Sequence, residues 1–273
     1  MSASIPDQMP DAWGAIAPGY EKVFEKLSSQ FAEAALALLK LRPGERVIDV
    51  AAGTGAFSLA AARAGAAVLA TDFAPAMVAR LRQRVVAERL SGISAEVMDG
   101  QALDVPDGSF DASVSILGLI FFPDICRGMT ELRRVLRPGG RAAIVCWGDP
   151  ANFQLMTLMM RAVQQTVPDF QPPAAVPVWA RLCGPASLKD QLQQAGFRQV
   201  EITTVTRSLR VDSPEAFWTD FASSVPPLAD LFRRLGPDRT AAVGRTVVEL
   251  LAASAGDGVP TLSAEACIGI GRT

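Results

Sequence analysis

The sequence predicts an α/β fold in which helices flank both faces of a doubly wound, seven-stranded and mostly parallel sheet. Three observations support this prediction. Short apolar runs alternate with helical patterns from residue 46 to residue 147, as expected for parallel strands joined by right-handed crossovers. The run VIDVAAGTGAFS, residues 47–58, has the pattern of a buried strand, a tight turn with two glycines and the start of a helix. Beyond residue 147, further helical patterns are long enough to form a helical lid from insertions.

The first half of the chain is predicted to hold one long helix followed by five strands. Residues 13–40 carry apolar side chains at three- and four-residue spacing, and Arg42-Pro43-Gly44 ends this helix. Strands are expected at 46–51, 67–72, 94–98, 110–117 and 142–147. Helices are expected between them, one ending near residue 63, one from Pro75 to about residue 90, and one to about residue 136, where Arg137-Pro138-Gly139-Gly140 stops it.

The second half is less regular. A methionine-rich helix follows residue 150, another helix ends at Ala195-Gly196, and residues 200–209 and 262–270 are expected to be the last two strands. Residues 213–255 are expected to form two helices, divided near Gly236-Pro237. We predict a single domain over residues 1–273, in which residues 13–147 form the ligand-binding core and the insertions 150–183 and 212–258 cap the substrate site. Residues 1–12 show no regular pattern.

The composition argues against several classes of protein. There is no histidine, which removes histidine-dependent triads, histidine metal sites and the usual general base, so we expect no metal. The four cysteines are scattered and are expected to be reduced core residues. The sequence contains neither an apolar run near the roughly 18 residues of a membrane span nor a signal-peptide pattern, so we expect a cytoplasmic protein without a membrane span. A net charge of −2, with arginines on solvated helix faces, argues against a nucleic-acid partner, and the oligomeric state stays open.

Aspartates at the ends of three predicted strands point to the kind of ligand. In a doubly wound sheet, ligands bind at the carboxyl ends of the strands. Asp72, at the second strand, can accept hydrogen bonds from a vicinal ribose diol, and Asp99, at the third, can accept from an adenine amino group. Asp49, inside the first strand, would repel a pyrophosphate and can support binding of an ammonium group, directly or through water. An adenosine with an amino-acid tail fits these three carboxylates.

Four ordered blocks carry a resemblance to a known family. They are VIDVAAGTGAFS, ATDFAPAMVARLRQR, MDGQALDVPDGSFDAS and ELRRVLRPGGRAAIVCW. With them, residues 13–147 resemble the class I S-adenosylmethionine-dependent methyltransferases of ubiquinone and menaquinone biosynthesis and of natural-product methylation, whose fold is Rossmann-like. The resemblance implies S-adenosyl-L-methionine as cofactor and S-adenosyl-L-homocysteine as product.

The resemblance also implies a set of cofactor-binding residues. Gly53 and Gly55 would line the methionine side, Asp72 would hold the ribose, Leu117 would lie near the sulfonium, and Tyr20 would close over the cofactor. The full predicted set is Tyr20, Asp49, Ala51, Gly53, Thr54, Gly55, Asp72, Phe73, Met77, Met98, Asp99, Gly100, Gln101 and Leu117. Two departures stand out. Ala51-Ala52 replaces a common Gly-Cys pair, and residues 117–124 replace the motif of the quinone enzymes, which argues against a quinone substrate.

Aromatic and methionine side chains in and beside the insertions predict a small, largely apolar or aromatic acceptor, such as a secondary metabolite. The predicted substrate residues are Phe122, Trp147, Phe153, Met156, Trp179, Phe217, Trp218 and Phe221. In-line methyl transfer depends mainly on positioning and needs little acid–base machinery when the nucleophile is electron-rich. Tyr20 and Asp149 are the candidate catalytic residues, although Asp149 could instead cap the helix that begins near Ala151.

Other interpretations remain open from the sequence alone. A nucleotide (NAD(P))-dependent oxidoreductase shares the sheet, but Ser58 stands where such an enzyme prefers its third glycine. A non-catalytic cofactor-binding or scaffolding protein is the second alternative. Asp49, Asp72 and Asp99 could each serve the local structure as loop acceptor, helix cap and turn former, and the lid aromatics could form the core of the lid itself.

Overall fold

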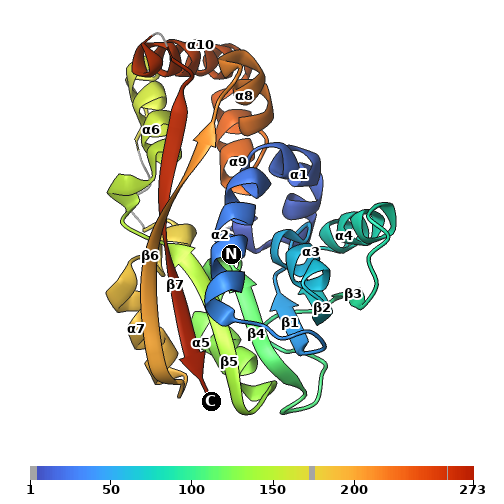
Figure 1. The fold of residues 1–273 in the computed structure, drawn as a ribbon. Helices are drawn as coiled ribbons and strands as arrows, with labels where there is room; N and C mark the ends of the chain where they lie inside the picture. The colour runs from blue at the N-terminus through green and yellow to red at the C-terminus, as the bar shows by residue number, and fades with distance from the viewer. Residues whose placement is uncertain (1–4, 172–175, 257) are drawn as a thin grey trace.

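The structure is a computed structural model, and it describes residues 5–171, 176–256 and 258–273. Seven strands form one sheet in the order β3-β2-β1-β4-β5-β7-β6 (Figure 1). The pairs from β3 to β5 are parallel, whereas β7 is antiparallel to both of its neighbours. The predicted fold class, a doubly wound and mostly parallel seven-stranded sheet, is confirmed.

The strands lie where the apolar runs predict them. They are β1 (Arg46–Val50), β2 (Ala67–Asp72), β3 (Ile93–Val97), β4 (Phe110–Ile116), β5 (Leu136–Trp147), β6 (Arg198–Arg210) and β7 (Thr261–Arg272). The start of β5 differs most from the prediction, since it begins at Leu136 and not near residue 142. The Pro-Gly-Gly segment expected to stop a helix is itself part of this strand, because Leu136 already pairs with Phe110 before a shift in register.

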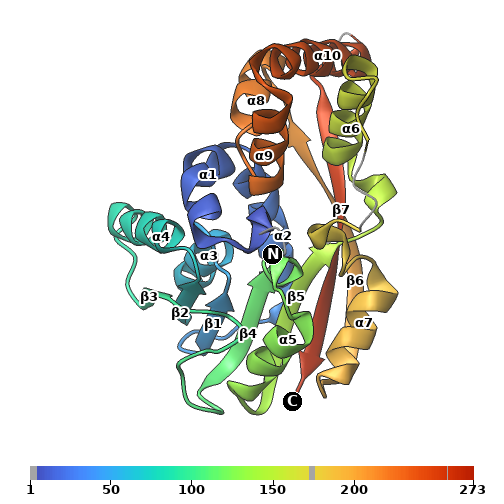
Figure 2. The same cartoon turned by 180° about the vertical axis from the view of Figure 1, so that it is seen from behind.

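Helices cover both faces of the sheet. They are α2 (Phe24–Leu39), α3 (Ala56–Arg63), α4 (Pro75–Ala87), α5 (Ile125–Arg134) and α7 (Pro185–Gln194), whereas α1 (Pro10–Lys22) packs mainly on other helices. In Figures 1 and 2, α2 and α3 lie on one face, while α5 and α7 lie on the other. The prediction of one helix over 13–40 is wrong, because the chain breaks at Val23, where φ is −117° and ψ is −70°. The break allows α2 to follow the sheet while α1 packs against α4.

Four helices form a cover above the carboxyl ends of the strands (Figure 1). They are α6 (Gln154–Thr166), α8 (Pro214–Phe221), α9 (Pro226–Leu235) and α10 (Pro237–Ala255). Residues 213–255 therefore hold three helices where two were predicted, because Pro226 begins α9 after a short turn. The pairing of β6 with β7 continues to Arg210 and Thr261, so a two-stranded ribbon carries α8, α9 and α10. Residues 172–175 and 257, which belong to the two predicted insertions, lie outside the described residues.

Four short 3-10 turns complete the connections near the strand ends. They are η1 (Pro6–Gln8), η2 (Leu119–Phe121), η3 (Pro150–Asn152) and η4 (Val178–Ala180). Within the described part of the chain, no helix is long and apolar enough to cross a membrane.

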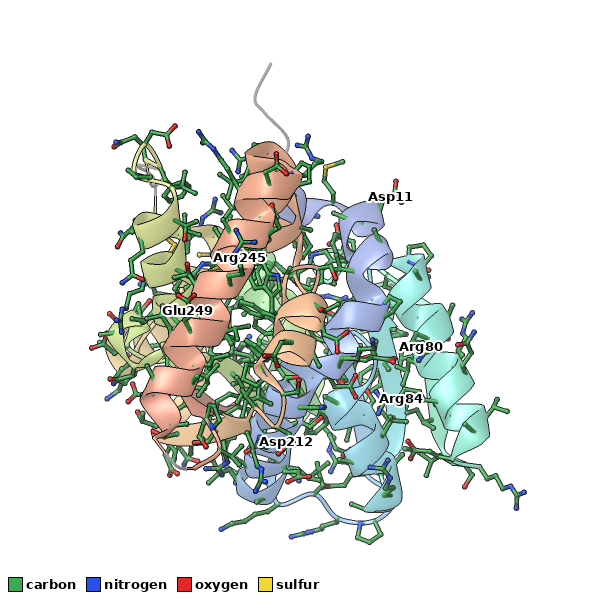
Figure 3. All side chains as sticks on the ribbon, turned by 90° about the horizontal axis from the view of Figure 1, so that it is seen from above. Asp11, Arg80, Arg84, Asp212, Arg245 and Glu249 are labelled. Atoms are coloured by element: carbon green, nitrogen blue, oxygen red, sulfur yellow. The ribbon has the colours of Figure 1, made fainter. Side chains whose placement is uncertain are left out.

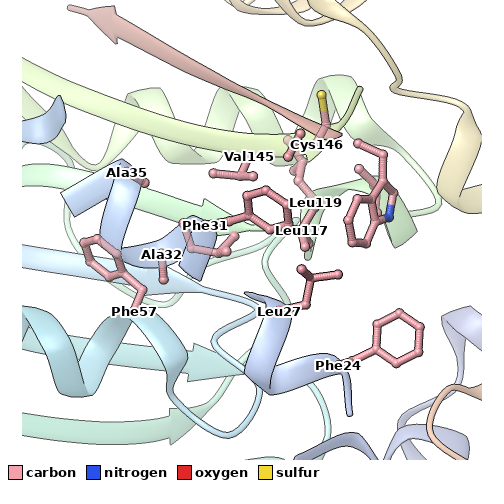
Figure 4. Packing of buried hydrophobic residues seen from close by; sticks show 14 of the residues in the cluster. Phe24, Leu27, Phe31, Ala32, Ala35, Phe57, Leu117, Leu119, Val145 and Cys146 are labelled. Atoms are coloured by element: carbon pink, nitrogen blue, oxygen red, sulfur yellow. The ribbon is translucent and has the colours of Figure 1, made fainter. Parts of the chain in front are cut away.

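The packing of α2 on the sheet fixes one wall of the site. Leu27, Phe31, Ala32 and Ala35 project from one side of α2 and are fully or almost fully buried, as Figure 4 shows together with Val145 of β5. Full burial of a Leu or Phe side chain contributes about 1.5–3 kcal/mol. This packing holds the first turn of α2 beside the cavity at the carboxyl ends of the strands.

Candidate active site

A cavity of about 820 Å³ lies at the carboxyl ends of β1 to β5, between the sheet and the cover. This is the place where the strand order reverses, with β1 and β4 as the central neighbours, and where doubly wound sheets bind ligands. The structure brings most of the predicted cofactor residues together on its wall: Tyr20, Ala51, Gly53, Asp72, Phe73, Met77, Met98, Asp99, Gly100, Gln101 and Leu117. The other three, Asp49, Thr54 and Gly55, do not line it and support the loop that does.

The loop after β1 depends on left-handed backbone conformations. The φ angles of Ala51, Gly53 and Gly55 are 58°, 55° and 98°. A Cβ on Gly55 would overlap Leu81 of α4, so this glycine allows close packing of the two elements. Among the described residues, a Cβ on Gly53 would meet only Tyr20, at 4.0 Å, which leaves the backbone open toward the cavity. The loop therefore allows a ligand to approach the main chain at Gly53.

Asp72 connects the ends of β1 and β2. Its Oδ2 accepts a hydrogen bond from the Gly53 amide at 2.8 Å, and its Oδ1 accepts from the Ala74 amide at 2.9 Å. The residue is 7% exposed and lies on the cavity wall. Burial raises the pKa of Asp72 to about 6, although the two amides favour the charged form. Each oxygen keeps a second lone pair, so Asp72 supports the local structure and can also accept hydrogen bonds from a ligand diol.

Asp49 lies one layer behind the wall and is 1% exposed. Its Oδ2 accepts a hydrogen bond from the Ser58 hydroxyl at 2.6 Å, whereas its Oδ1 has no hydrogen-bond partner among the described residues. Burial raises the pKa of Asp49 to about 7, with a smaller contribution from the charge of Asp72. A buried carboxylate oxygen without a partner is rare, and a water or a cationic group at the loop would complete its hydrogen bonding.

A partly buried ion pair supports the same loop. Glu25 of α2 is 6% exposed and accepts hydrogen bonds from the Thr54 hydroxyl and from Arg84 of α4. Arg84 also donates to the main-chain oxygen of Thr54 at 2.9 Å. The arginines were expected on solvated helix faces, and this expectation is wrong for Arg84, whose guanidinium donates to Glu25 and to the Thr54 main-chain oxygen. The sequence contains a signal for this ion pair. Glu21 and Glu25 are four residues apart, and so are Arg80 and Arg84, which is the spacing of two facing helices.

The end of β3 contributes a polar turn. Asp99 is exposed and its Oδ1 accepts from the backbone amide and the side-chain amide of Gln101, at 2.8 and 3.2 Å. Gln101 in turn accepts from the Asp124 amide at 2.9 Å. A Cβ on the neighbouring Gly100 would overlap Phe122 and lie 2.7 Å from Val50, so the main chain packs closely here. Asp99 thus has its predicted turn role and still lies on the cavity wall.

The other end of the cavity is apolar and aromatic. Of the predicted substrate residues, Trp147, Phe153, Met156 and Trp179 line the cavity here, and Phe122 lines it beside Gly100 at the end of β3. The Trp147 and Phe153 rings stack with centroids 4.3 Å apart, and Trp179 meets Phe153 edge-on at 5.9 Å. These rings form a continuous wall between β5 and the cover.

The remaining predicted aromatics lie away from the cavity. Phe217 stacks on Phe221 at 5.1 Å, and Trp218 packs edge-on against Phe232 at the same distance. None of Phe217, Trp218 and Phe221 is on the cavity wall, so these side chains pack within the cover.

The two candidate catalytic residues differ in position. Asp149 is not on the cavity wall and caps the η3 turn by accepting from the Ala151 amide at 2.9 Å. Tyr20 lines the cavity and stacks on Phe24 at 6.3 Å. Burial raises the pKa of Tyr20 to about 12, so its hydroxyl stays protonated at neutral pH and can donate a hydrogen bond. Among the described residues there is no group of three or more histidine, cysteine or acidic side chains that could hold a metal.

Comparisons with known proteins agree with this geometry. A family model described as a methyltransferase domain matches residues 48–144. An uncharacterized protein of Mycobacterium bovis is 30% identical over 245 residues, which cover 88% of this chain and 86% of that protein. The chain belongs to the class I S-adenosylmethionine-dependent methyltransferases.

Two further similarities place this methyltransferase among its relatives. The ubiquinone/menaquinone biosynthesis C-methyltransferase of Geobacter sulfurreducens is 33% identical over 154 residues, which cover 54% of this chain and 60% of that enzyme. Among solved structures, the YcgJ protein of Bacillus subtilis has a TM-score of 0.60 at 13% identity and covers 89% of this chain and 97% of its own. The second similarity shows the fold alone.

The methyltransferase has cavity residues that the sequence analysis missed. Asp7 and Gln8, in the segment without a regular pattern, lie on the wall, and so do Trp13 and Phe121. The cover adds Asp169, Arg234 and Arg239, of which Asp169 and Arg239 form an ion pair at 3.3 Å. Asp7 and Gln8 are polar residues before the first helix and could have been considered as site residues. Nothing in the sequence, however, shows that this segment folds back over the ends of the strands.

The contact between the β1 and β4 loops gives a testable prediction. A Cβ on Gly118 would overlap the Ala51 side chain and lie 3.0 Å from the Ala51 main-chain oxygen. Gly118→Ala is therefore expected to lower the free energy of unfolding by about 2 kcal/mol, as overpacking typically does. Chemical denaturation measures this loss. Adding Ala51→Gly removes the opposing methyl group and relieves a left-handed alanine, so the double variant should regain part of the stability; a double variant no more stable than Gly118→Ala would contradict this explanation.

Proposed function

We propose that this methyltransferase transfers a methyl group from S-adenosyl-L-methionine to a small, largely apolar or aromatic metabolite. The observation that carries the proposal is one cavity with two chemically different ends. Acidic and glycine residues of the strand ends form one end, and stacked aromatic rings of β5 and the cover form the other. A charged adenosine derivative suits the first end, and an apolar acceptor suits the second.

The residues present fit the cofactor. Asp72 offers two carboxylate oxygens for a ribose diol, and Asp49 has a buried oxygen that no described residue satisfies. Gly53 leaves room for the methionine portion beside the loop. The same carboxylates disfavour a pyrophosphate, which weakens the alternative of an NAD(P)-dependent oxidoreductase.

The acceptor would lie beneath the cover. We assign residues 13–147 to cofactor binding and the insertions 150–183 and 212–258 to capping the acceptor, all within one domain. Phe153 and Met156 come from the first insertion, and Leu228 and Leu231 from the second, so both insertions supply apolar side chains to the cavity. A covered apolar cavity favours a discrete small molecule, such as a secondary metabolite, over a nucleic acid or a protein substrate.

The chemistry follows from positioning. The cofactor supplies an electrophilic methyl group on its sulfonium. The chain would orient the acceptor on the Trp147 and Phe153 rings and exclude water with the cover. Holding the reacting atoms about 3–3.5 Å apart and in line can supply roughly 7–11 kcal/mol of the barrier. Tyr20, protonated at neutral pH, would donate a hydrogen bond and would not act as a base.

Calorimetry and an acceptor screen test the proposal. We expect saturable binding of S-adenosylmethionine and S-adenosylhomocysteine and none of NADH. A panel of aromatic and apolar metabolites, incubated with isotopically labelled cofactor, should yield a labelled product. Binding of NADH without S-adenosylhomocysteine would favour the oxidoreductase. Tight binding of S-adenosylhomocysteine with no transfer to any member of a broad panel would favour a non-catalytic cofactor-binding protein.

A further inference from the structure

Two residues on the wall of the cavity, Asp7 and Gln8, each have one buried side-chain atom without a hydrogen-bond partner among the described residues. Asp7 is 4% exposed, and its Oδ1 has no hydrogen-bond partner within residues 5–171, 176–256 and 258–273. The neighbouring Gln8 has a buried Nε2 that also lacks a partner among those residues. Both belong to the η1 turn, and both line the cavity that holds the proposed cofactor and acceptor sites.

The backbone of this turn is held independently of these side chains. Trp13 donates from its indole Nε1 to the main-chain oxygen of Asp7 at 2.9 Å. The Trp13 ring meets Phe121, which follows β4, edge-on with centroids 5.0 Å apart. The turn also contacts α9 of the cover. The Asp7 side chain therefore has no part in the hydrogen bond that anchors the turn.

The charged groups around Asp7 do not neutralise it. Burial raises the pKa of Asp7 to about 6 and outweighs the guanidinium of Arg181, which lowers it. Among the described residues, Asp7 takes part in no ion pair. The other charged residues near this end of the cavity have partners of their own: Arg234 pairs with Asp230 at 3.0 Å, and Arg239 pairs with Asp169.

We propose that Asp7 and Gln8 recognise a hydroxyl group on an otherwise apolar methyl acceptor. A hydroxyl can donate its hydrogen to the Asp7 carboxylate and accept a hydrogen bond from the Gln8 amide. An ammonium group cannot accept from Gln8, and a carboxylate cannot donate to Asp7 and would be repelled by it. Buried polar groups are unfavourable without partners, so a ligand that supplies both hydrogen bonds gains affinity and specificity together. This inference rests on the proposed function and names the class of its acceptor.

Three probes with one ring system test the class of acceptor. A naphthol, a naphthoate and a naphthylmethylamine are titrated by calorimetry into the full chain saturated with S-adenosylhomocysteine. We expect the naphthol to bind at least tenfold more tightly than the other two. Equal affinity for all three, preference for the acid or the amine, or no binding of the naphthol would overturn the proposal. Failure of S-adenosylhomocysteine itself to bind would instead overturn the proposed function.

Variants locate the effect at Asp7. Asp7→Asn is expected to weaken naphthol binding about tenfold, through loss of one charge-assisted hydrogen bond, and to leave the affinity for S-adenosylhomocysteine unchanged. Its melting temperature at pH 8 should be equal to or higher than that of the wild type, because a buried carboxylate is removed and the Trp13 bond to the main chain stays. Asp11→Asn is the matched control, since Asp11 lies four residues later and points into solvent from α1 (Figure 3). A lower melting temperature for Asp7→Asn with unchanged naphthol binding would show that Asp7 has only a structural role.

Discussion

Replacing Asp72 by alanine is expected to weaken the binding of S-adenosylhomocysteine about 100-fold. The variant removes both carboxylate oxygens that would accept hydrogen bonds from the ribose hydroxyls, and hydrogen bonds to a charged group contribute about 1.5–3 kcal/mol each. It also leaves the Gly53 and Ala74 amides without their acceptor, which loosens the loop beside the ligand. A total near 3 kcal/mol corresponds to about 100-fold in the dissociation constant. Calorimetric titration at pH 8 measures this loss.

Asp99→Ala is the matched control for Asp72→Ala. Asp99 also lies on the cavity wall but is exposed, and its Oδ1 already accepts from Gln101, so we expect a loss of less than about tenfold. Equal losses for the two variants would show that Asp72 does not hold the ribose.

The affinity for S-adenosylhomocysteine should also depend on pH. The pKa of Asp72 in the folded protein is raised to about 6, and the hydrogen bonds to the ribose favour its charged form. The affinity is therefore expected to fall as the pH is lowered from 8 through about 6. The stability of the free protein changes with pH in the opposite direction. A carboxyl group whose pKa is higher in the folded protein than in the unfolded chain stabilises the fold at pH values below its unfolded pKa. This contribution is lost as the pH rises to about 6. Asp72→Asn should flatten both dependences.

Arg84→Ala is expected to lower the free energy of unfolding by about 3 kcal/mol, the second large effect. Removing the arginine leaves Glu25 as a buried charge without its cation, which typically costs about 3–5 kcal/mol, and Arg84 is partly exposed, which favours the lower end of that range. The Thr54 main-chain oxygen also loses a hydrogen-bond donor, so the loop after β1 should become less rigid. Urea denaturation measures the stability, and a calorimetric titration should show weaker binding of S-adenosylhomocysteine than in the wild type.

Arg80→Ala serves as the comparison one helical turn away. Arg80 pairs with Glu21, but both side chains are more exposed than those of Arg84 and Glu25. Exposed ion pairs contribute about 0–1 kcal/mol, so this variant should lose no more than that. If the two arginine variants were equally stable, the Glu25 pair would not support the loop.

The sequence predicted the centre of the sheet well because the central strands β1, β4 and β5 are largely buried on both faces, unlike the edge strands β3 and β6. Such strands appear as continuous apolar runs, and β4, whose seven residues are all buried, is the clearest case. The aspartate at the end of β2 was predictable for a related reason, since the carboxyl end of a parallel strand is where a polar residue can meet both loop amides and a ligand.

The cover and the N-terminal segment were less predictable. The break at Val23 leaves no gap in the apolar spacing, because α1 and α2 each bury one side against a different partner. Aromatic residues in the insertions have the same local pattern whether they face the cavity, as Trp179 does, or pack inside the cover, as Phe221 does. Asp7 reaches the cavity only through contacts with residues far along the chain, which no local pattern records.

The β6–β7 ribbon has a consequence for how such a protein can diversify. Three of the cover helices, α8 to α10, are inserted between Arg210, the last residue of β6, and Thr261, the first residue of β7. This segment supplies Leu228 and Leu231 to the cavity wall, whereas the aspartates and glycines proposed to bind the cofactor lie in the loops after β1 and β2. If the cover holds the acceptor as proposed, sequence changes between β6 and β7 can alter which acceptor fits while the strand-end loops stay the same.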